Sequence, residues 1–349
     1  MSGFSVYLGE EADWSYIQSM IHLGYDTLFT SLQIPEESDE VKLQYFKELL
    51  HQLQDAPVTL IIDANPSLLN HTFYQLLSFY SNGNIVIRID HSTSIDVINQ
   101  LTQAGLSCCL NTSTLTEALL TQLKQQVTHF HKIVYCHNYY PRPDTGLSHS
   151  FVQAQNALIR RFNTEAIIYG FISGTKRRGP LYKGLPTLED TRDAHPVYSA
   201  QMLIDTGVNH VIVGDIQLQS KYAQQLIQAV AERHFTLRCK VASTDSQVQA
   251  LLQMTHQVRM DTPEAVIRSH NARQCIEQSI SPTQTTTRTR GMITVDNERN
   301  GRYQGELQLI KQPLPAHPNV NCIGEMIEED IALLDCLSGN DTFSFELNT

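Results

Sequence analysis

The sequence predicts an α/β fold, a (β/α)₈ barrel followed by a smaller β-rich domain. Short apolar runs rich in β-branched and aromatic residues alternate with longer segments of helical periodicity over residues 1–232. This alternation is typical of βα units that build a parallel sheet. Eight such units in about 230 residues match the usual size of a closed barrel. The first run lacks a glycine-rich phosphate fingerprint after it, which disfavours an open dinucleotide-binding sheet.

The barrel elements follow from hydrophobic periodicity and from the length of each run. The predicted strands are 4–8, 27–32, 58–62, 85–89, 106–110, 133–136, 166–172 and 210–213. The predicted helices are 14–22, 41–53, 68–79, 95–101, 115–123, 151–162, 197–204 and 222–230. Together they define a first domain over residues 1–232.

The pattern changes after residue 232, and we predict a second, β-rich domain over residues 233–349. Its predicted strands are 234–242, 290–296, 302–310 and 343–347, and its short helical segments lie near 262–270 and 325–334. The polar stretch 279–289 is rich in Thr and Gln, which indicates an exposed loop.

Composition excludes several classes of protein. The chain has 349 residues, 41% hydrophobic content and a net charge of −11 without a basic block, so we expect a small-molecule ligand rather than nucleic acid or a membrane. Seven cysteines without C-x-x-C spacing disfavour a disulfide framework or a zinc site. The N-terminus lacks signal-peptide features, so we expect a cytoplasmic protein. The oligomeric state stays open.

Acidic residues follow the first four predicted strands. They are Glu10, Glu37, Asp63 and Asp90. Because barrel active sites lie at the carboxyl ends of the strands, we predict that these side chains line a catalytic centre, although each is also a candidate helix cap. Paired carboxyl groups suit glycoside hydrolysis, with retention and inversion both open. An oxygen-ligand metal site ranks lower, and we predict no metal or cofactor.

Residues that follow other strands are predicted to bind the substrate. The run 133–136 ends in His137, Asn138, Tyr139 and Tyr140, with two prolines that stiffen the loop. The aromatic rings can cover a sugar, and His137 can instead be a buried structural histidine. The other predicted substrate-binding residues are Asn65, Asn111, Lys183 and Glu189.

Several motifs, in their order and spacing, resemble the 6-phospho-N-acetylmuramidase family. They include Asp63-Ala-Asn-Pro66, Ile87-Arg-Ile-Asp90, His137-Asn-Tyr-Tyr-Pro141, Gly184-Leu-Pro-Thr-Leu-Glu189 and Gly301-Arg-Tyr-Gln-Gly-Glu306. The resemblance implies a barrel with a cyclophilin-like β-barrel domain. It also implies hydrolysis of the β-1,4 bond of 6-phospho-N-acetylmuramyl-N-acetylglucosamine, to N-acetylmuramic acid 6-phosphate and N-acetylglucosamine, in cell-wall sugar recycling.

A phosphate on the substrate needs cations away from the acidic rim. Arg290 and Arg302 stand in the second-domain motifs, and Tyr303 adds a hydroxyl, so we predict that they bind the phosphate, with Arg178 as the barrel alternative. Pairing of these arginines with Asp296 or Glu306 inside their own domain is equally compatible with the sequence.

Two other functions stay open. One is a metal-dependent aldolase or isomerase, although no lysine lies within the predicted barrel strands to form a Schiff base. The other is a regulatory protein that binds sugar phosphates without catalysis, for which four acids on one rim would repel the ligand.

Overall fold

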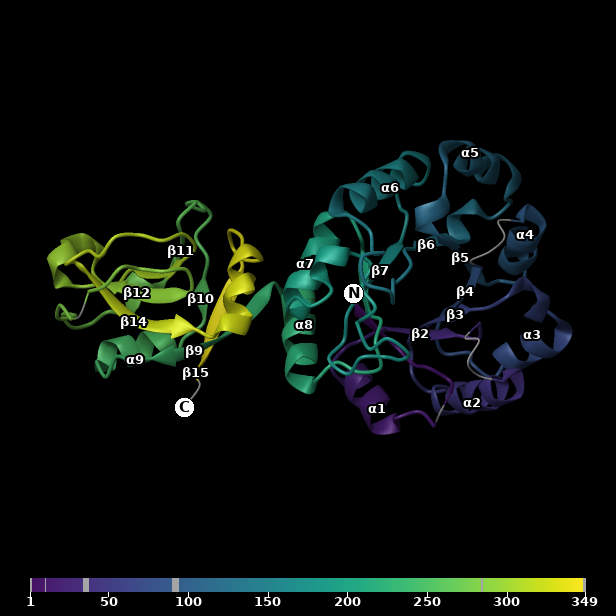
Figure 1. The fold of residues 1–349 in the computed structure, drawn as a ribbon, viewed down its shortest axis with the longest axis horizontal. Helices are drawn as coiled ribbons and strands as arrows, with labels where there is room; N and C mark the ends of the chain where they lie inside the picture. The colour runs from purple at the N-terminus through teal and green to yellow at the C-terminus, as the bar shows by residue number, and fades with distance from the viewer. Residues whose placement is uncertain (1, 10, 34–37, 90–93, 284, 348–349) are drawn as a thin grey trace. The chain divides into compact units, whose positions relative to one another are not determined.

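The computed structural model describes residues 2–9, 11–33, 38–89, 94–283 and 285–347, drawn in Figure 1. The chain divides into two compact units, Met1–Ile227 and Gln228–Thr349. The division falls within the last barrel helix, close to the predicted boundary after residue 232.

Within the described part of the first unit, eight parallel strands close into a barrel, which confirms the predicted fold class. The strands are β1 (Ser2–Ser5), β2 (Thr27–Ser31), β3 (Thr59–Asp63), β4 (Ile85–Ile89), β5 (Ser107–Asn111), β6 (Ile133–Cys136), β7 (Ile168–Ile172) and β8 (His210–Val213). Each strand pairs with the next, and β8 closes the sheet against β1.

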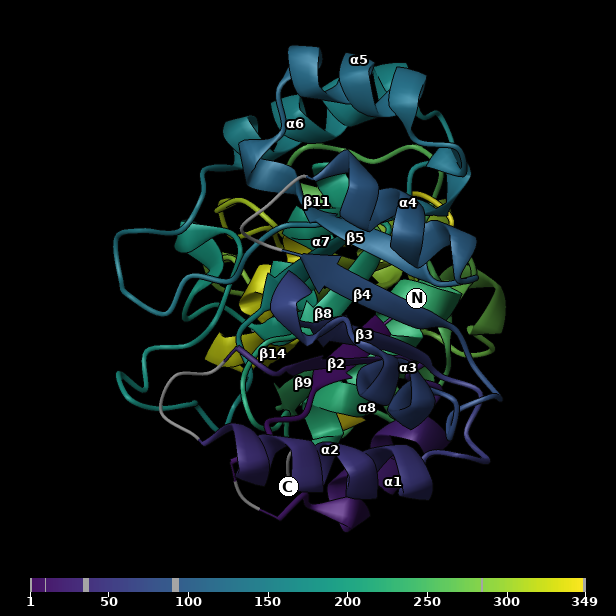
Figure 2. The same cartoon turned by 90° about the vertical axis from the view of Figure 1, so that its right-hand side faces the viewer.

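Helices follow the strands and cover the outside of the barrel, as Figure 2 shows for α1, α2 and α3 beside β2, β3 and β4. They are α1 (Trp14–His22), α2 (Asp39–Gln52), α3 (His71–Leu77), α4 (Ile95–Gln103), α5 (Glu117–Gln126), α6 (His149–Phe162), α7 (Pro196–Asp205) and α8 (Ser220–Glu232). The predicted helix 68–79 is wrong at its start. Residues Pro66–Leu68 form a separate 3₁₀ turn, η1. The helix α3 begins only after Asn70, whose side chain accepts from the Phe73 amide and caps the helix.

The inside of the barrel is filled by buried side chains from successive strands. Phe29 and Phe171 meet edge to face at 5.1 Å, and Tyr139 from the loop after β6 packs against both rings. The remaining members of this cluster are Ile61, Val86, Cys109, Val134, Cys136, Tyr169 and Ile212. This core lies directly beneath the carboxyl ends of the strands.

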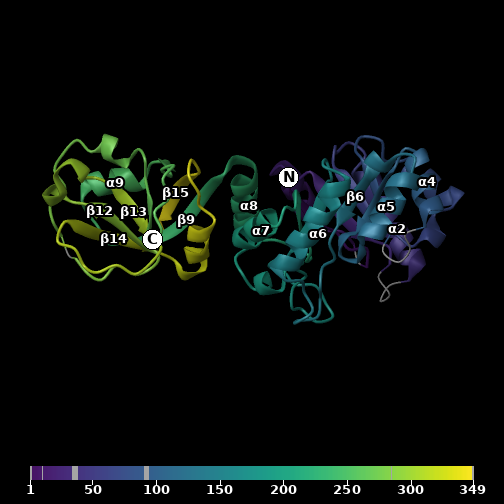
Figure 3. The same cartoon turned by 90° about the horizontal axis from the view of Figure 1, so that it is seen from above.

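The second unit is built on a mixed sheet of seven described strands in the order β10-β15-β9-β14-β12-β13-β11. They are β9 (His234–Val241), β10 (His256–Gln257), β11 (Val266–Arg268), β12 (Met292–Asp296), β13 (Leu307–Ile310), β14 (Val320–Met326) and β15 (Thr342–Leu347). Only the pairing of β15 with β9 is parallel among the described pairs. Figure 3 shows α9 (Ser246–Leu252) beside this sheet.

One prediction for the second unit is wrong, a second is confirmed, and a third is wrong at its start. The segment 262–270 is not helical, because residues Val266–Arg268 pair with β13. The predicted short helical segment near 325–334 is present as the 3₁₀ helix η7 (Glu328–Asp335), which follows the end of β14. The predicted strand 302–310 begins only at Leu307, because residues Glu298–Tyr303 form the 3₁₀ segment η6. Gly301 interrupts this segment at φ 54°, and Gly305 follows it with φ 82°.

Candidate active site

The carboxylate of Asp63 stands at the carboxyl end of β3 and is fixed by its two neighbouring strands. The pairing register places Ser31 of β2 and Arg88 of β4 opposite Asp63. Arg88 Nη1 donates to Asp63 Oδ1 at 2.7 Å, Ser31 Oγ donates to Oδ2 at 2.8 Å, and Gln33 Nε2 donates to Oδ1 at 3.0 Å. Asp63 is 8% exposed, so this network holds a charged group in a defined orientation below the rim.

Arg88 connects this carboxylate to the loop after β6. Its Nη2 donates to the side-chain oxygen of Asn138, and the main-chain oxygen of Asn138 accepts from Thr187 Oγ1 at 2.9 Å. Asp63, Arg88, Asn138 and Tyr139 then line a cavity of about 140 Å³ together with Phe29 and Phe171.

Tyr139 offers this cavity a hydroxyl group. Its ring packs edge to face against Phe29 and Phe171, with centroids 6.2 and 5.1 Å away. Burial raises the pKa of Tyr139, and the negative charge of Asp63 adds to the rise, against opposing contributions from Arg178 and others. Tyr139 therefore stays a neutral hydrogen-bond donor near Asp63.

Arg178 lies on the same rim, in the segment after β7. Its guanidinium carbon is 4.2 Å from the centroid of the Tyr7 ring, and its amide donates to Asp215 Oδ1 at 2.9 Å. Asp215 is fully buried and also accepts from the amides of Gly174 and Leu185, so it organises this loop rather than facing a substrate. Tyr7 and Arg178 line a second cavity of about 380 Å³, whose wall includes Lys176, Glu11 and Asp13.

His137 lies beneath the rim. It has 0% exposure, and its Nε2 is 2.8 Å from Asn156 Oδ1. Burial lowers the pKa of His137 to about 4, against the hydrogen bond to Asn156. This placement fits the structural role that the sequence left open for His137.

Glu189 joins two loops of the rim. Its carboxylate accepts from Arg192 Nε at 2.8 Å and Nη2 at 2.6 Å, and from the amides of Asp144 and Gly146. Arg192 Nη1 also donates to the main-chain oxygen of Tyr140. The hydrogen bonds from Arg192 lower the pKa of Glu189 to about 2. This geometry makes Glu189 a positioning residue for the loop that carries Asn138 and Tyr139.

The other predicted binding residues have local partners or point to solvent. Asn65 and Asn111 accept from the amides of Ser67 and Ser113 and begin short 3₁₀ turns. The hydroxyl of Tyr140 is 3.4 Å from Ser113 Oγ, and Lys183 is exposed. Glu10, Glu37 and Asp90 lie outside the described residues.

The predicted phosphate residues of the second unit separate into two places. Arg290 Nη2 is 2.8 Å from Asp335 Oδ2, and Nη1 donates to the main-chain oxygen of Lys311. Arg290 is therefore paired within its own unit, with Asp335 rather than with Asp296 or Glu306. Arg302 Nη2 donates instead to the Tyr303 hydroxyl at 2.9 Å.

Sequence reasoning missed Arg88, Ser31, Gln33 and Tyr7 as members of the site. Arg88 could have been predicted from the sequence, because a charged residue within the apolar run 85–89 needs a buried partner of opposite charge. Ser31 and Gln33 could not have been predicted in this way, since their role depends on strand register.

Across the described residues, no group of three or more His, Cys, Asp or Glu side chains is arranged to hold a metal ion. Nor does any helix there have the length and apolar character needed to cross a membrane.

The closed parallel barrel and the charged cavity at its strand ends define a (β/α)₈ barrel protein with an enzyme-like site. Comparison with family models refines this class. Residues 2–228 match the N-terminal model and residues 234–346 the C-terminal model of 6-phospho-N-acetylmuramidase. The chain belongs to the 6-phospho-N-acetylmuramidase family, a family of glycosidases.

Two solved structures share the architecture of the whole chain. A conserved Enterococcus faecalis protein of unknown function is 29% identical, with a TM-score of 0.85 over 100% of this chain and 96% of that one. An uncharacterised B. cereus protein is 23% identical, with a TM-score of 0.77 over 99% of both chains. The search of curated proteins returned no match.

Proposed function

We propose that this chain hydrolyses the β-1,4 bond of 6-phospho-N-acetylmuramyl-N-acetylglucosamine and releases N-acetylmuramic acid 6-phosphate and N-acetylglucosamine. Membership of the 6-phospho-N-acetylmuramidase family over both units supports this substrate. The observation that carries the proposal is the Asp63 carboxylate, fixed by Arg88 at a strand end beside a small polar cavity.

Glycoside hydrolysis needs one carboxyl group that donates a proton and one that acts as base or nucleophile. The ion pair with Arg88 and the hydrogen bonds from Ser31 and Gln33 hold the Asp63 carboxylate in one orientation at the end of β3. We assign the role of base or nucleophile to this oriented carboxylate. We assign the proton donor to one of the other strand-end acids, Asp90, Glu10 or Glu37.

The residues nearest this carboxylate are the best candidates for sugar contacts. Asn138 has an amide group beside Arg88, and Tyr139 has a neutral hydroxyl in the same cavity. Two such groups fix the orientation of a sugar ring through directed hydrogen bonds. Asn65, Asn111, Tyr140, Lys183 and Glu189 stay predictions, Glu189 as a residue that orients the loop.

The proposed setting is the recycling of cell-wall sugars in the cytoplasm, and its support is the family alone. The proposed partner is the free phosphorylated disaccharide, and two carboxyl groups suffice for its hydrolysis without a cofactor.

The decisive experiment measures release of N-acetylglucosamine from the phosphorylated disaccharide by the purified chain. The unphosphorylated disaccharide is the matched control, and a parallel reaction contains a chelator. We expect release from the phosphorylated substrate at the same rate with and without chelator. Absence of release would contradict the proposed function, and loss of release with chelator would favour a metal-dependent reaction.

A further inference from the structure

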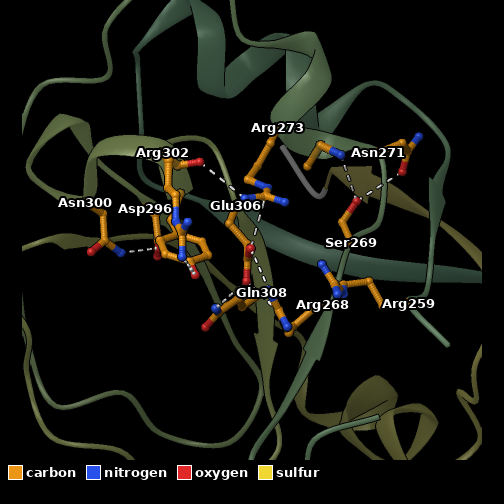
Figure 4. Close-up of polar contacts among 12 residues, drawn as sticks. Arg259, Arg268, Ser269, Asn271, Arg273, Asp296, Asn300, Arg302, Glu306 and Gln308 are labelled. Carbon is orange, nitrogen blue, oxygen red and sulfur yellow. Dashed lines mark hydrogen bonds and ion pairs between the residues drawn. The ribbon is translucent and has the colours of Figure 1, made fainter. Parts of the chain in front are cut away.

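The second unit has four arginines gathered around one buried carboxylate. Figure 4 shows Arg268 and Arg273 directed toward Glu306 from different segments, with Arg259 and Arg302 nearby. Arg268 holds Glu306 with two hydrogen bonds, Nε to Oε1 at 2.6 Å and Nη2 to Oε2 at 2.9 Å. Arg273 Nε lies 3.7 Å from Oε2. Glu306 is 3% exposed, so it acts as a fixed anchor for this arginine cluster.

The anchor is charged. Burial raises the pKa of Glu306, but hydrogen bonds and charge from Arg268, with help from Gln308 and Arg273, outweigh it, and the pKa is lowered overall. The local fold also holds the anchor in place. Gly305 has φ of 82°, and a side chain there would meet Ile276 Cγ1 at 2.2 Å. Close packing at this glycine keeps the segment that carries Arg273 against the segment that carries Arg302.

The arginine cluster has more positive than negative charge. Asp261 pairs with Arg259 and Arg268, and Glu306 pairs with Arg268 and Arg273. Four guanidinium groups against these two carboxylates leave an excess of two positive charges. Arg302 makes no ion pair with any described residue, and it is exposed. Asp296 lies behind the cluster and is offset in part by Arg288.

Arg273 and Arg302 meet at one aromatic ring. Their guanidinium carbons lie 5.5 and 4.9 Å from the centroid of Tyr303. Arg302 Nη2 donates to the Tyr303 hydroxyl at 2.9 Å, and Arg273 Nη1 donates to the main-chain oxygen of Arg302 at 3.2 Å. An anion bound beside the Tyr303 ring is attracted by both guanidinium groups.

We propose that Arg273 and Arg302, with the hydroxyl of Tyr303, bind the phosphate monoester of a sugar 6-phosphate. This inference rests on the proposed function, whose product carries such a phosphate. A phosphate monoester carries a charge of about −1.5 to −2 at pH 7, which matches the excess of two positive charges. Guanidinium groups bind it through paired hydrogen bonds, and the tyrosine adds a further donor. Glu306 is a positioning residue that orients Arg268 and Arg273.

The binding affinity for the reaction product tests this site independently of catalysis. Calorimetry on the full chain compares N-acetylmuramic acid 6-phosphate with N-acetylmuramic acid for the wild type, Arg302→Ala, Arg273→Ala and Arg302→Lys. The matched control is Arg299→Ala, an exposed arginine in the same 3₁₀ segment as Arg302. Thermal unfolding checks that each variant is folded.

We expect each alanine variant to lose roughly 10- to 100-fold in affinity for the phosphorylated sugar, with unchanged affinity for the unphosphorylated one. Arg302→Lys should fall between, because it keeps the charge and loses the paired geometry. The inference is overturned if the wild type does not prefer the phosphorylated sugar, or if both alanine variants keep that preference.

The two failures can be told apart. A chain that cleaves the phosphorylated disaccharide while Arg273→Ala and Arg302→Ala keep the preference for phosphate leaves the function standing and removes this site. A chain that cleaves neither disaccharide, yet binds the sugar phosphate through these two arginines, contradicts the proposed function and supports this site.

Discussion

At the scale of single residues, the site depends on a carboxylate whose charge is stabilised by its neighbours. Asp63 is nearly buried, and its ion pair with Arg88 sits at the junction of three strands. A buried charge is tolerated only where it is paired and hydrogen-bonded. The Asp63–Arg88 pair therefore affects both catalysis and stability. Substitutions can measure the two effects separately.

Substitution Asp63→Asn should lower kcat roughly 100- to 10,000-fold, because the amide cannot act as base or nucleophile while the shape of the cavity is kept. The measurement is steady-state hydrolysis of the phosphorylated disaccharide. The matched control is Asp55→Asn at an exposed position, which should leave kcat unchanged. Near wild-type turnover in Asp63→Asn would remove Asp63 from the catalytic residues.

Substitution Arg88→Met should destabilise the barrel by about 3–5 kcal/mol, since it leaves the Asp63 charge buried without its main partner. Urea unfolding measures the loss. The double variant Arg88→Met with Asp63→Asn should recover part of it, because the unpaired charge is gone. A double variant no more stable than Arg88→Met alone would show that the ion pair is not the cause.

At the scale of elements, the loops after β6 and β7 are held together by the Glu189–Arg192 pair. The Glu189 carboxylate accepts from the amides of Asp144 and Gly146, and the Arg192 guanidinium donates to the main-chain oxygen of Tyr140. The loop that carries Asn138 and Tyr139 is therefore ordered before a ligand arrives, which reduces the entropy cost of binding.

The Glu189 pair should also give the stability of the chain a dependence on pH. The folded-state pKa of Glu189 is about 2, below the ordinary value of 4.5, so its stabilisation is present above pH 4.5 and is lost as the pH falls toward 2. The difference in unfolding free energy between the wild type and Glu189→Gln should shrink over that window. The exposed Glu165→Gln is the control. A difference that is constant with pH would contradict the assignment.

At the scale of the barrel as a whole, stability comes from an interior core to which the strands β2 to β8 contribute side chains. Phe29 is 1% exposed and touches Phe171 and Tyr139. Phe29→Ala should cost about 3–5 kcal/mol in unfolding free energy through the lost contacts and the cavity left behind. The control Phe79→Ala, at a side chain that is 60% exposed, should change stability little. Equal effects of the two substitutions in chemical unfolding would argue against this core.

The sequence alone determined the barrel, because apolar runs buried on both faces and alternating helices admit few other arrangements. Runs such as 133–136 and 210–213 are strands within the bounds that periodicity predicts. It also placed Asp63 at the rim, since a carboxylate that ends an apolar strand must lie at the carboxyl end of the sheet.

The tertiary structure decided which side chains meet. Strand register paired Asp63 with Arg88, and burial turned His137 toward Asn156, neither of which is encoded in local spacing. In the second unit, long-range pairing with β13 overrode the helical pattern of 262–270. Local periodicity specifies which elements form, whereas partners separated by tens of residues are chosen only when the sheet closes and every buried charge must find its counterpart.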